Sequence, residues 1–412
     1  MRLLISFIAL FLSALFIQFG SGSLGPLDAL SGAAYGWSNA EIGMLGSAHF
    51  AGFFIGCWAM PRMIGQVGHS RAFAAAAAVG ATGVILHPVL IGPEYWAGLR
   101  VLSGISIAGC YTVVESWMQA KIDKSSRGRV FSVYRFIDLV GSIGAQGLIA
   151  LLEPAAYASY NIIAIFCVLC LMPLALTTQV PPVVDHPPRL MPRKAWRVSP
   201  LACFAIMIAG ATGASFRMVG PLFAVEIGLE ASGIAAFLGA AVVGAAAAQI
   251  PVGFLADKLD RRWVLNGLSV VAIVTCSFVT LFLMPGDTVG ALMASAAFGA
   301  SSITIYSVAS AHANDFCKED FRVELNAALI FFFSAGAITA PTIAAAMIEA
   351  YGPTGLFWFI GAAHLVLIAF TLYRMTRRGA APSTPYRYMP RTSMVLARLA
   401  RRGGDENKEN SE

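Results

Sequence analysis

Residues 253–262 read GFLADKLDRR, a short segment with five charged side chains that lies between two long apolar runs. These runs, at 232–255 and 263–284, each hold more than 20 mostly apolar residues. An α-helix of about 20 residues crosses the hydrocarbon core of a bilayer. The segment therefore predicts a tight loop between two membrane-spanning helices.

The same alternation of apolar runs and short polar gaps extends over the whole chain. Hydrophobic residues make up 58% of the 412 residues and charged residues only 12%, whereas soluble domains carry about 25% charged residues. This composition excludes a soluble globular protein, and its low charge excludes a disordered one. Twelve spans are predicted, at 4–25, 42–60, 72–91, 94–119, 130–152, 157–178, 199–224, 232–255, 263–284, 287–311, 323–347 and 352–375.

The charged residues divide sharply between the two sides of the predicted membrane. Gaps after even-numbered spans contain Lys and Arg, whereas gaps after odd-numbered spans contain Asp and Glu but neither Lys nor Arg. Because basic loops stay in the cytoplasm, we expect a multi-pass plasma membrane protein with both termini cytoplasmic. The net charge of +6 then indicates contact with anionic lipid and not with nucleic acid.

Several marks recur at a spacing of 191–195 residues, which indicates an internal repeat. The pairs are Gly25-Pro26-Leu27 with Gly220-Pro221-Leu222, Arg71 with Arg262, and Arg129 with Arg322. A parallel repeat of this kind predicts two six-helix halves with a substrate site between them near the middle of the membrane. The expected parts are an N-terminal bundle at 1–178, a cytoplasmic linker at 179–198, a C-terminal bundle at 199–375 and a cytoplasmic tail at 376–412.

The loop at 253–262 resembles the signature loop of the major facilitator superfamily, through Gly253, Asp257, Arg261 and Arg262. Asp260 stands where that family usually has glycine. The matching loop of the first half, PRMIGQVGHSR at 61–71, is degenerate. The segments PRMIGQVGHSRAF, VESWMQ, SRGRVFSVYR and AHAND are similar to a branch of bacterial transporters of this superfamily that have no settled substrate.

The resemblance implies an all-α fold of two pseudo-symmetric six-helix bundles and a role in secondary transport. It also implies that the signature loop latches helix ends during conformational switching. We expect the same inner-face gating role for a further set of charged residues, namely Arg71, Arg129, Arg135, Asp315 and Arg322.

Three charged side chains within spans are candidates for proton coupling. Arg100 and Gly104 form an R-x-x-x-G that resembles a second motif of the family, whose arginine is associated with proton coupling. Asp138 and Glu115 are the acids that we expect to work with Arg100, because burial and a nearby arginine shift a carboxylate in opposite directions. The alternatives are a structural ion pair or snorkelling for Arg100, and a fixed salt-bridge network for Glu115 with Arg135.

Further polar residues are candidates for the substrate cavity. Arg217 has the geometry to clamp a carboxylate or phosphate, with anchoring at the membrane interface as the alternative. His49 is a candidate proton carrier or a hydrogen-bonded neutral side chain. The remaining candidates, which either line the cavity or pack and bridge helices, are Tyr111, Gln146 and Gln249.

We therefore expect a monomeric, proton-coupled secondary transporter of a small organic solute, anionic or amphiphilic. No nucleotide-binding loop, zinc-protease motif or nucleophile elbow stands out, so we expect no enzyme activity, cofactor or metal. One alternative is a drug or metabolite efflux antiporter, which is disfavoured because Gly141, Gly144 and Gly147 replace the Gly-Pro antiporter motif in the fifth span. The other is a non-transporting sensor or assembly factor, supported by the degenerate loop at 61–71.

Overall fold

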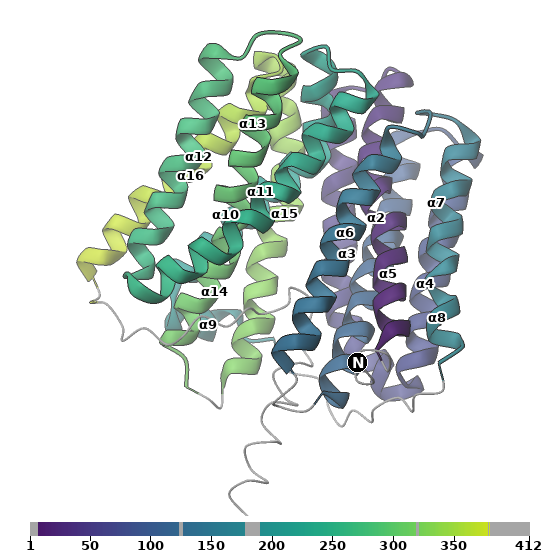
Figure 1. Ribbon diagram of the computed structural model, residues 1–412, viewed down its shortest axis with the longest axis horizontal. Helices are drawn as coiled ribbons and strands as arrows, with labels where there is room; N and C mark the ends of the chain where they lie inside the picture. Colours follow the sequence, from purple (N-terminus) through teal and green to yellow (C-terminus); the bar gives the residue numbers. More distant parts are fainter. Residues whose placement is uncertain (1–6, 123–126, 178–189, 319–320, 378, 380–412) are drawn as a thin grey trace, which may run out of the picture.

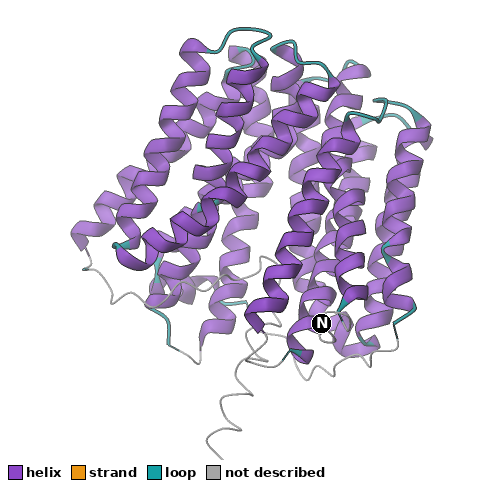
Figure 2. Cartoon of the chain, in the orientation of Figure 1, coloured by secondary structure: helices purple, strands orange, loops and turns teal. Residues whose placement is uncertain are grey.

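The computed structural model describes residues 7–122, 127–177, 190–318, 321–377 and 379, and this part of the chain is helical, without strands (Figure 2). The first half contains α2 (Ile8–Ala34), α3 (Asn39–Val67), α4 (His69–Leu86), η1 (His87–Val89), α5 (Pro93–Lys121), α6 (Arg127–Ile149), α7 (Tyr157–Leu169) and α8 (Leu171–Ala175). The second half contains α9 (Pro192–Val198), α10 (Pro200–Glu226), α11 (Ala231–Lys258), α12 (Arg261–Phe282), α13 (Thr288–Phe298), η2 (Gly299–Ile303), α14 (Ile305–Asp315), α15 (Arg322–Tyr351) and α16 (Gly355–Arg377).

Each of the twelve predicted spans corresponds to a helix or a stack of helices. Among the described residues, eleven helical segments are long and apolar enough to cross a membrane. The remaining span is α6, a helix of 23 residues whose charged residues include Arg135 and Asp138 and lower its hydropathy. The tenth span is continuous from α13 to α14 through one π-helical turn, η2. The prediction of an all-α polytopic fold is confirmed.

Two groups of helices lie side by side in Figure 1, α2–α8 in purple to blue and α10–α16 in green to yellow. Within each group the helices pack extensively on one another, and the groups meet through α3 with α15, α6 with α11, and α10 with α2 and α3. Part of the predicted linker is the short helix α9, which packs on α10 and α15. The predicted tail lies outside the described residues beyond Gly379.

The prediction that the first span ends at residue 25 is wrong. The helix α2 continues through Pro26 to Ala34. A proline is tolerated inside a membrane helix because neighbouring groups satisfy the freed backbone. Asp28, which the sequence placed in a gap, is consequently a helical residue that is fully buried. In the same way Arg62 and Arg71 belong to α3 and α4 and not to a loop.

Close helix crossings in both halves depend on glycine. A Cβ atom at Gly52 of α3 would lie 2.0 Å from the backbone oxygen of Val101 in α5, and one at Gly104 would lie 2.0 Å from that of His49. The crossing of α11 with α13 and η2 has the same close approach, at Gly244 of α11 and Gly299 of η2. These two glycines lie 192 and 195 positions after Gly52 and Gly104, so the crossings follow the spacing of the sequence repeat.

We expect Gly104→Ala to destabilise the protein by about 1–3 kcal/mol, because the added methyl group collides with rigid backbone. Gly98→Ala is the matched control on the same helix, since a Cβ there meets no atom within 4 Å. The measurement is the apparent melting temperature of each purified variant in detergent. Equal melting temperatures for the two variants would contradict the close crossing of α3 and α5.

The two halves are joined at the end of the molecule that includes the loops at 35–38, 150–156 and 283–287, which contain no Lys or Arg. We call this the outer end. There Asn39 donates a hydrogen bond to Glu226 across 3.3 Å, and the hydroxyls of Ser47 and Thr342 lie 2.9 Å apart. Each contact joins one half to the other, so the outer end is closed between them.

Candidate functional site

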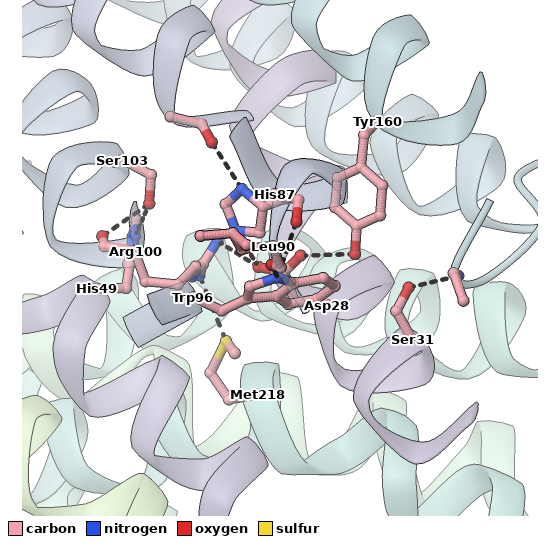
Figure 3. Close-up of polar contacts among 12 residues, drawn as sticks. Asp28, Ser31, His49, His87, Leu90, Trp96, Arg100, Ser103, Tyr160 and Met218 are labelled. Carbon is pink, nitrogen blue, oxygen red and sulfur yellow. Dashed lines mark hydrogen bonds and ion pairs between the residues drawn. The ribbon is translucent and has the colours of Figure 1, made fainter. Parts of the chain in front are cut away.

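A buried ion pair lies inside the first half near the outer end (Figure 3). Nη1 of Arg100, on α5, lies 3.5 Å from Oδ2 of Asp28, on α2. The side chains are 2% and 0% exposed. Removing two charges from water costs free energy, and an ion pair at this long separation regains only part of that free energy. Within the described part of the chain, Asp28 Oδ2 and the Nε and Nη1 atoms of Arg100 have no hydrogen-bond partner.

His87 approaches the same carboxylate oxygen. Its Nε2 lies 3.5 Å from Asp28 Oδ2, and its Nδ1 lies 2.7 Å from the backbone oxygen of Gly83. A carbonyl only accepts hydrogen bonds, so Nδ1 carries the hydrogen. In a neutral imidazole Nε2 then presents a lone pair to the carboxylate. The lone pairs of His87 Nε2 and Asp28 Oδ2 repel each other unless one of the two atoms carries a proton. The geometry thus defines a place for one exchangeable proton.

Aromatic side chains enclose the pair on its outer side. Tyr160 donates a hydrogen bond of 3.1 Å to Asp28 Oδ1, and its ring stacks on His87 with 5.4 Å between centroids. Trp96 holds the η1 turn by donating to the backbone oxygens of His87 and Leu90. The ring of Trp37 packs on Trp96 at 4.9 Å. These rings are large and apolar, so they separate the ion pair from the outer solvent.

Beside Arg100 the first half contains a small cavity whose lining is mostly apolar. Its volume is about 30 Å³, which is room for roughly two water molecules. His49, Ser103 and Ser106 are its polar lining residues next to Arg100, together with Ser21. The cavity therefore leaves room for water beside the guanidinium.

The structure gives Arg100 a different acid from the two that the sequence suggested. Asp138 accepts hydrogen bonds from Gln18 at 2.6 Å and from Tyr111 at 3.1 Å, and lies 3.2 Å from Arg135. Glu115 accepts from the buried Tyr134 at 3.2 Å. In this second cluster Glu115 lies less than two helical turns before the end of α5, and Asp138 about three turns after the start of α6. The acid in contact with Arg100 is Asp28.

The other polar candidates lie near the contact between the halves or inside one half. His49 is half-buried, and its Nδ1 lies 3.0 Å from Ser103 Oγ. Arg217 on α10 is exposed in the second half of its helix, close enough to His49 for its charge to act on the ring. Gln146 on α6 is buried beside Gly239 of α11. Gln249 donates to Ser307 within the second half.

The signature loop forms its own ionic cluster. Arg261, which is buried, pairs with Asp315 and lies 3.6 Å from Asp257. The departure at Asp260 has a structural explanation, because this residue caps α12 by accepting from the backbone NH of Arg262 and also pairs with the Arg262 side chain at 2.5 Å. Burial raises the pKa of Asp260, but the hydrogen bonds from Arg262 outweigh it, so this pKa lies below its ordinary value.

The remaining predicted gating residues are spread over several helices. Gly253 is buried within α11. Arg71 is exposed near the start of α4, and Arg322 begins α15. Arg129 belongs to α6, and its side chain lies outside the described part. The structure therefore brings Arg261, Asp315 and Asp257 together, and it places Arg71 on α4, Arg129 and Arg135 on α6, and Arg322 on α15.

Comparison with known proteins gives concordant results. A model of the Major Facilitator Superfamily matches residues 202–402. An uncharacterized MFS-type transporter of Enterobacter sp. (strain 638) is 26% identical over 347 residues, covering 83% of this chain and 88% of that protein. The uncharacterized MFS-type transporter YcaD of Salmonella arizonae is 26% identical over 341 residues, covering 81% and 86%. The chain is thus similar to transporters of the major facilitator superfamily over most of its length.

Solved structures of two transporters have the same fold as this chain. The nucleoside transporter NupG aligns with a TM-score of 0.74 at 13% identity, over 92% of this chain and 100% of that one. A bacterial homologue of the human lysosomal transporter Spinster, in an inward-facing and occupied conformation, aligns with a TM-score of 0.70 at 17% identity, over 91% and 96%. At these identities the likeness concerns the fold alone.

Sequence reasoning missed Asp28, His87 and Tyr160. The available signal for Asp28 is its position directly after the Gly25-Pro26-Leu27 mark of the repeat. A span that ends at residue 25 places Asp28 outside the helix and hides this signal. His87 and Tyr160 gave no signal of their own, because their importance comes from the helices that bring them to Asp28.

Proposed function

We propose that this transporter moves a small organic solute across the plasma membrane by alternating access, coupled to protons through Asp28. The observation that supports the proposal most is the placement of a buried carboxylate between a guanidinium and an imidazole whose unprotonated nitrogen faces it. Ionisable residues inside membrane spans are costly, and they mark ion pathways and proton relays. Asp28 replaces Asp138 and Glu115 as the acid that works with Arg100.

Loss or gain of the proton changes the charge balance around Arg100. When Asp28 is ionised it neutralises the guanidinium. When Asp28 is protonated, Arg100 remains as a buried cation without a counterion, which is strongly unfavourable. The two protonation states therefore favour different arrangements of the helices, and a proton shifts the population between them.

Other titratable and charged groups surround this site. Asp28 faces His87 from η1, Arg100 from α5 and Tyr160 from α7. Tyr35 lies beyond Tyr160, and the charges of Arg100 and Arg217 act on His49. Among these groups, the Asp28 and His87 pair has the shared proton position.

We propose that the substrate enters the space between the two halves from the cytoplasmic end. The outer end is closed by the contacts Asn39–Glu226 and Ser47–Thr342. The charge partition places the outer end away from the cytoplasm, and both termini inside. Rocking of the halves about this contact would expose the same site to the other side.

The proposed substrate is a small organic anion with an apolar body. An arginine exposed in the interior of a membrane span has a strong preference for an aqueous cavity over lipid, which places Arg217 toward the space between the halves. One turn away on α10, Ala214 packs with Phe50 and Ala337, and Phe333 borders the same cluster. A cation beside aromatic rings from both halves suits an anionic group attached to an apolar one.

The transport proposal is tested by a substrate search. Metabolites are profiled inside cells and in the medium for a strain lacking the gene, with and without the wild-type protein, in the presence and absence of a protonophore. We expect at least one anionic compound to be redistributed only with the protein and only while the proton gradient persists. A compound that moves equally with and without the protonophore would contradict proton coupling.

With that compound in hand, we expect Arg217→Gln to raise its KM by about 10-fold or more, because a hydrogen bond to a charged group contributes about 1.5–3 kcal/mol. Arg62→Gln is the matched control, since Arg62 is exposed on α3 and stacks on Trp58 at 4.1 Å. Initial rates of uptake or efflux give the KM. An unchanged KM in Arg217→Gln would remove this residue from the substrate site.

A further inference from the structure

One side chain of the second half reaches into the first half and touches the ion pair. Met218 of α10 is fully buried, and its Sδ lies 3.7 Å from Nη2 of Arg100 (Figure 3). This contact joins the second half directly to the Asp28 and Arg100 pair. Met218 therefore connects the packing of the two halves to the charged cluster.

Two glycines of the first half form the notch that receives Met218. A Cβ atom at Gly46 of α3 would lie 2.5 Å from Met218 Cγ, and one at Gly25 of α2 would lie 3.1 Å from Met218 Sδ. Pro341 of α15 packs on Gly46 as well. Any larger side chain at Gly46 would push Met218 out, so the notch has the shape of this one residue.

The notch lies within the set of contacts that closes the outer end. Gly46 is followed by Ser47, which meets Thr342 of the other half. If the halves separate at this end, Met218 must leave the notch and uncover Arg100. While Met218 is in place, a thioether, which is only a weak acceptor, covers one side of the guanidinium where water would otherwise stand.

We propose that Met218 is a positioning residue that makes closure of the outer end depend on the charge of Asp28. Seating Met218 removes water from Arg100, and this is tolerable while ionised Asp28 supplies the counter-charge. Protonation of Asp28 removes that charge and disfavours the seated state, so the outer end opens. The inference rests on the proposed role of Asp28 and adds the side chain through which the second half responds.

The experiment measures opening of the outer end directly and needs no substrate. Ser47→Cys is labelled in intact cells with a membrane-impermeant maleimide, and the protein carrying only its seven native cysteines gives the background. Labelling rates are compared between about pH 8 and about pH 5, so that the two rates report on uptake of a proton. Inside-out vesicles serve as the control for the side of access.

In the otherwise native background we expect labelling to rise by about 5-fold or more at the lower pH, as for a typical coupling between two sites. Met218→Ala leaves room for water beside Arg100, so its labelling should change by less than about twofold with pH. Met218→Leu keeps the apolar cover and should retain the rise. Met60→Ala is the matched control, because Met60 is a buried methionine seated on Gly109 within the first half.

Two other carboxylates lie at the outer end, and the experiment separates their contribution from that of Asp28. Glu226 of α10 bonds Asn39 at the closed contact, and Glu41 caps α3 through Ser38. Glu226→Gln and Glu41→Gln should both retain the rise in labelling. A loss of the rise in either variant would assign the pH response to the surface contact and overturn the role of Met218.

The remaining outcomes distinguish this inference from the proposed function. If Asp28→Asn labels equally at both pH values while Met218→Ala keeps the rise, Asp28 is the proton site and the role of Met218 is wrong. If Asp28→Asn keeps the rise, the proposed proton site itself is wrong. If Met218→Leu loses the rise in labelling as Met218→Ala does, the apolar cover over Arg100 is not the cause of the pH response. Size-exclusion profiles of each variant confirm that the compared proteins are folded.

Discussion

Asp28→Asn is expected to abolish accumulation of the substrate against its gradient while leaving equilibrative movement intact. Asparagine has nearly the shape of aspartate and still accepts the hydrogen bond from Tyr160, but it cannot take up or release a proton. One proton moving through a potential of 100 mV supplies about 2.3 kcal/mol. At about 1.36 kcal/mol per tenfold change, this corresponds to a concentration ratio of about 50, and the ratio should fall to about 1 in the variant.

The measurement is the steady-state ratio of labelled substrate across the membrane of proteoliposomes with an imposed proton gradient. Asp138→Asn is the matched control, since Asp138 is another acid inside the first half, bonded to Gln18 and Tyr111. We expect Asp138→Asn to retain most of the accumulation. If Asp138→Asn collapses the ratio and Asp28→Asn does not, proton coupling belongs to the inner cluster.

Arg100→Gln is expected to give the largest loss of stability, about 3–5 kcal/mol, because it leaves Asp28 as an unpaired charge in the interior. Both side chains are almost fully buried, so water cannot replace the lost partner. The double variant Asp28→Asn with Arg100→Gln removes both charges and should recover much of the stability. This recovery is a property of a coupled pair and would not follow from lost packing alone.

Thermal unfolding of the purified variants in detergent provides the test. Arg217→Gln is the control, because Arg217 is exposed on α10 and its replacement should shift the melting temperature little. A double variant that is less stable than Arg100→Gln would show that the charges of Asp28 and Arg100 do not compensate each other. The functional prediction for Asp28→Asn would then need a different partner for the carboxylate.

The cluster around Asp138 shows which side-chain contacts can be predicted from spacing along one helix and which cannot. Arg135 and Asp138 lie three residues apart on one helix, and the structure places their side chains 3.2 Å apart, as neighbours at that spacing require. Gln18 and Tyr111 contact Asp138 from other helices. The spacing of residues along α6 could not predict these contacts. The same applies to the pairing of Arg261 with Asp315 across α12 and α14.

The sequence alone was enough to locate the spans, apart from the end of the first one, and to show the spacing of the repeat and the family resemblance. Hydropathy, charge and the signature loop at 253–262 are properties of consecutive residues, so they are legible without a structure. The glycine crossings at Gly52 and Gly104 and at Gly244 and Gly299 even preserve the spacing of the repeat.

The identity of the acid that meets Arg100, and of the side chain that covers the pair, depends on the tertiary structure. That outcome depends on α2 continuing through Pro26 and on the rotation of α2, α5 and η1 about their axes, which sets the faces that Asp28, Arg100 and His87 present. It depends also on Met218 entering a notch in the other half. Packing between distant segments sets these relations, because each arises from the fit of side chains on different helices and not from the order of residues in any one of them.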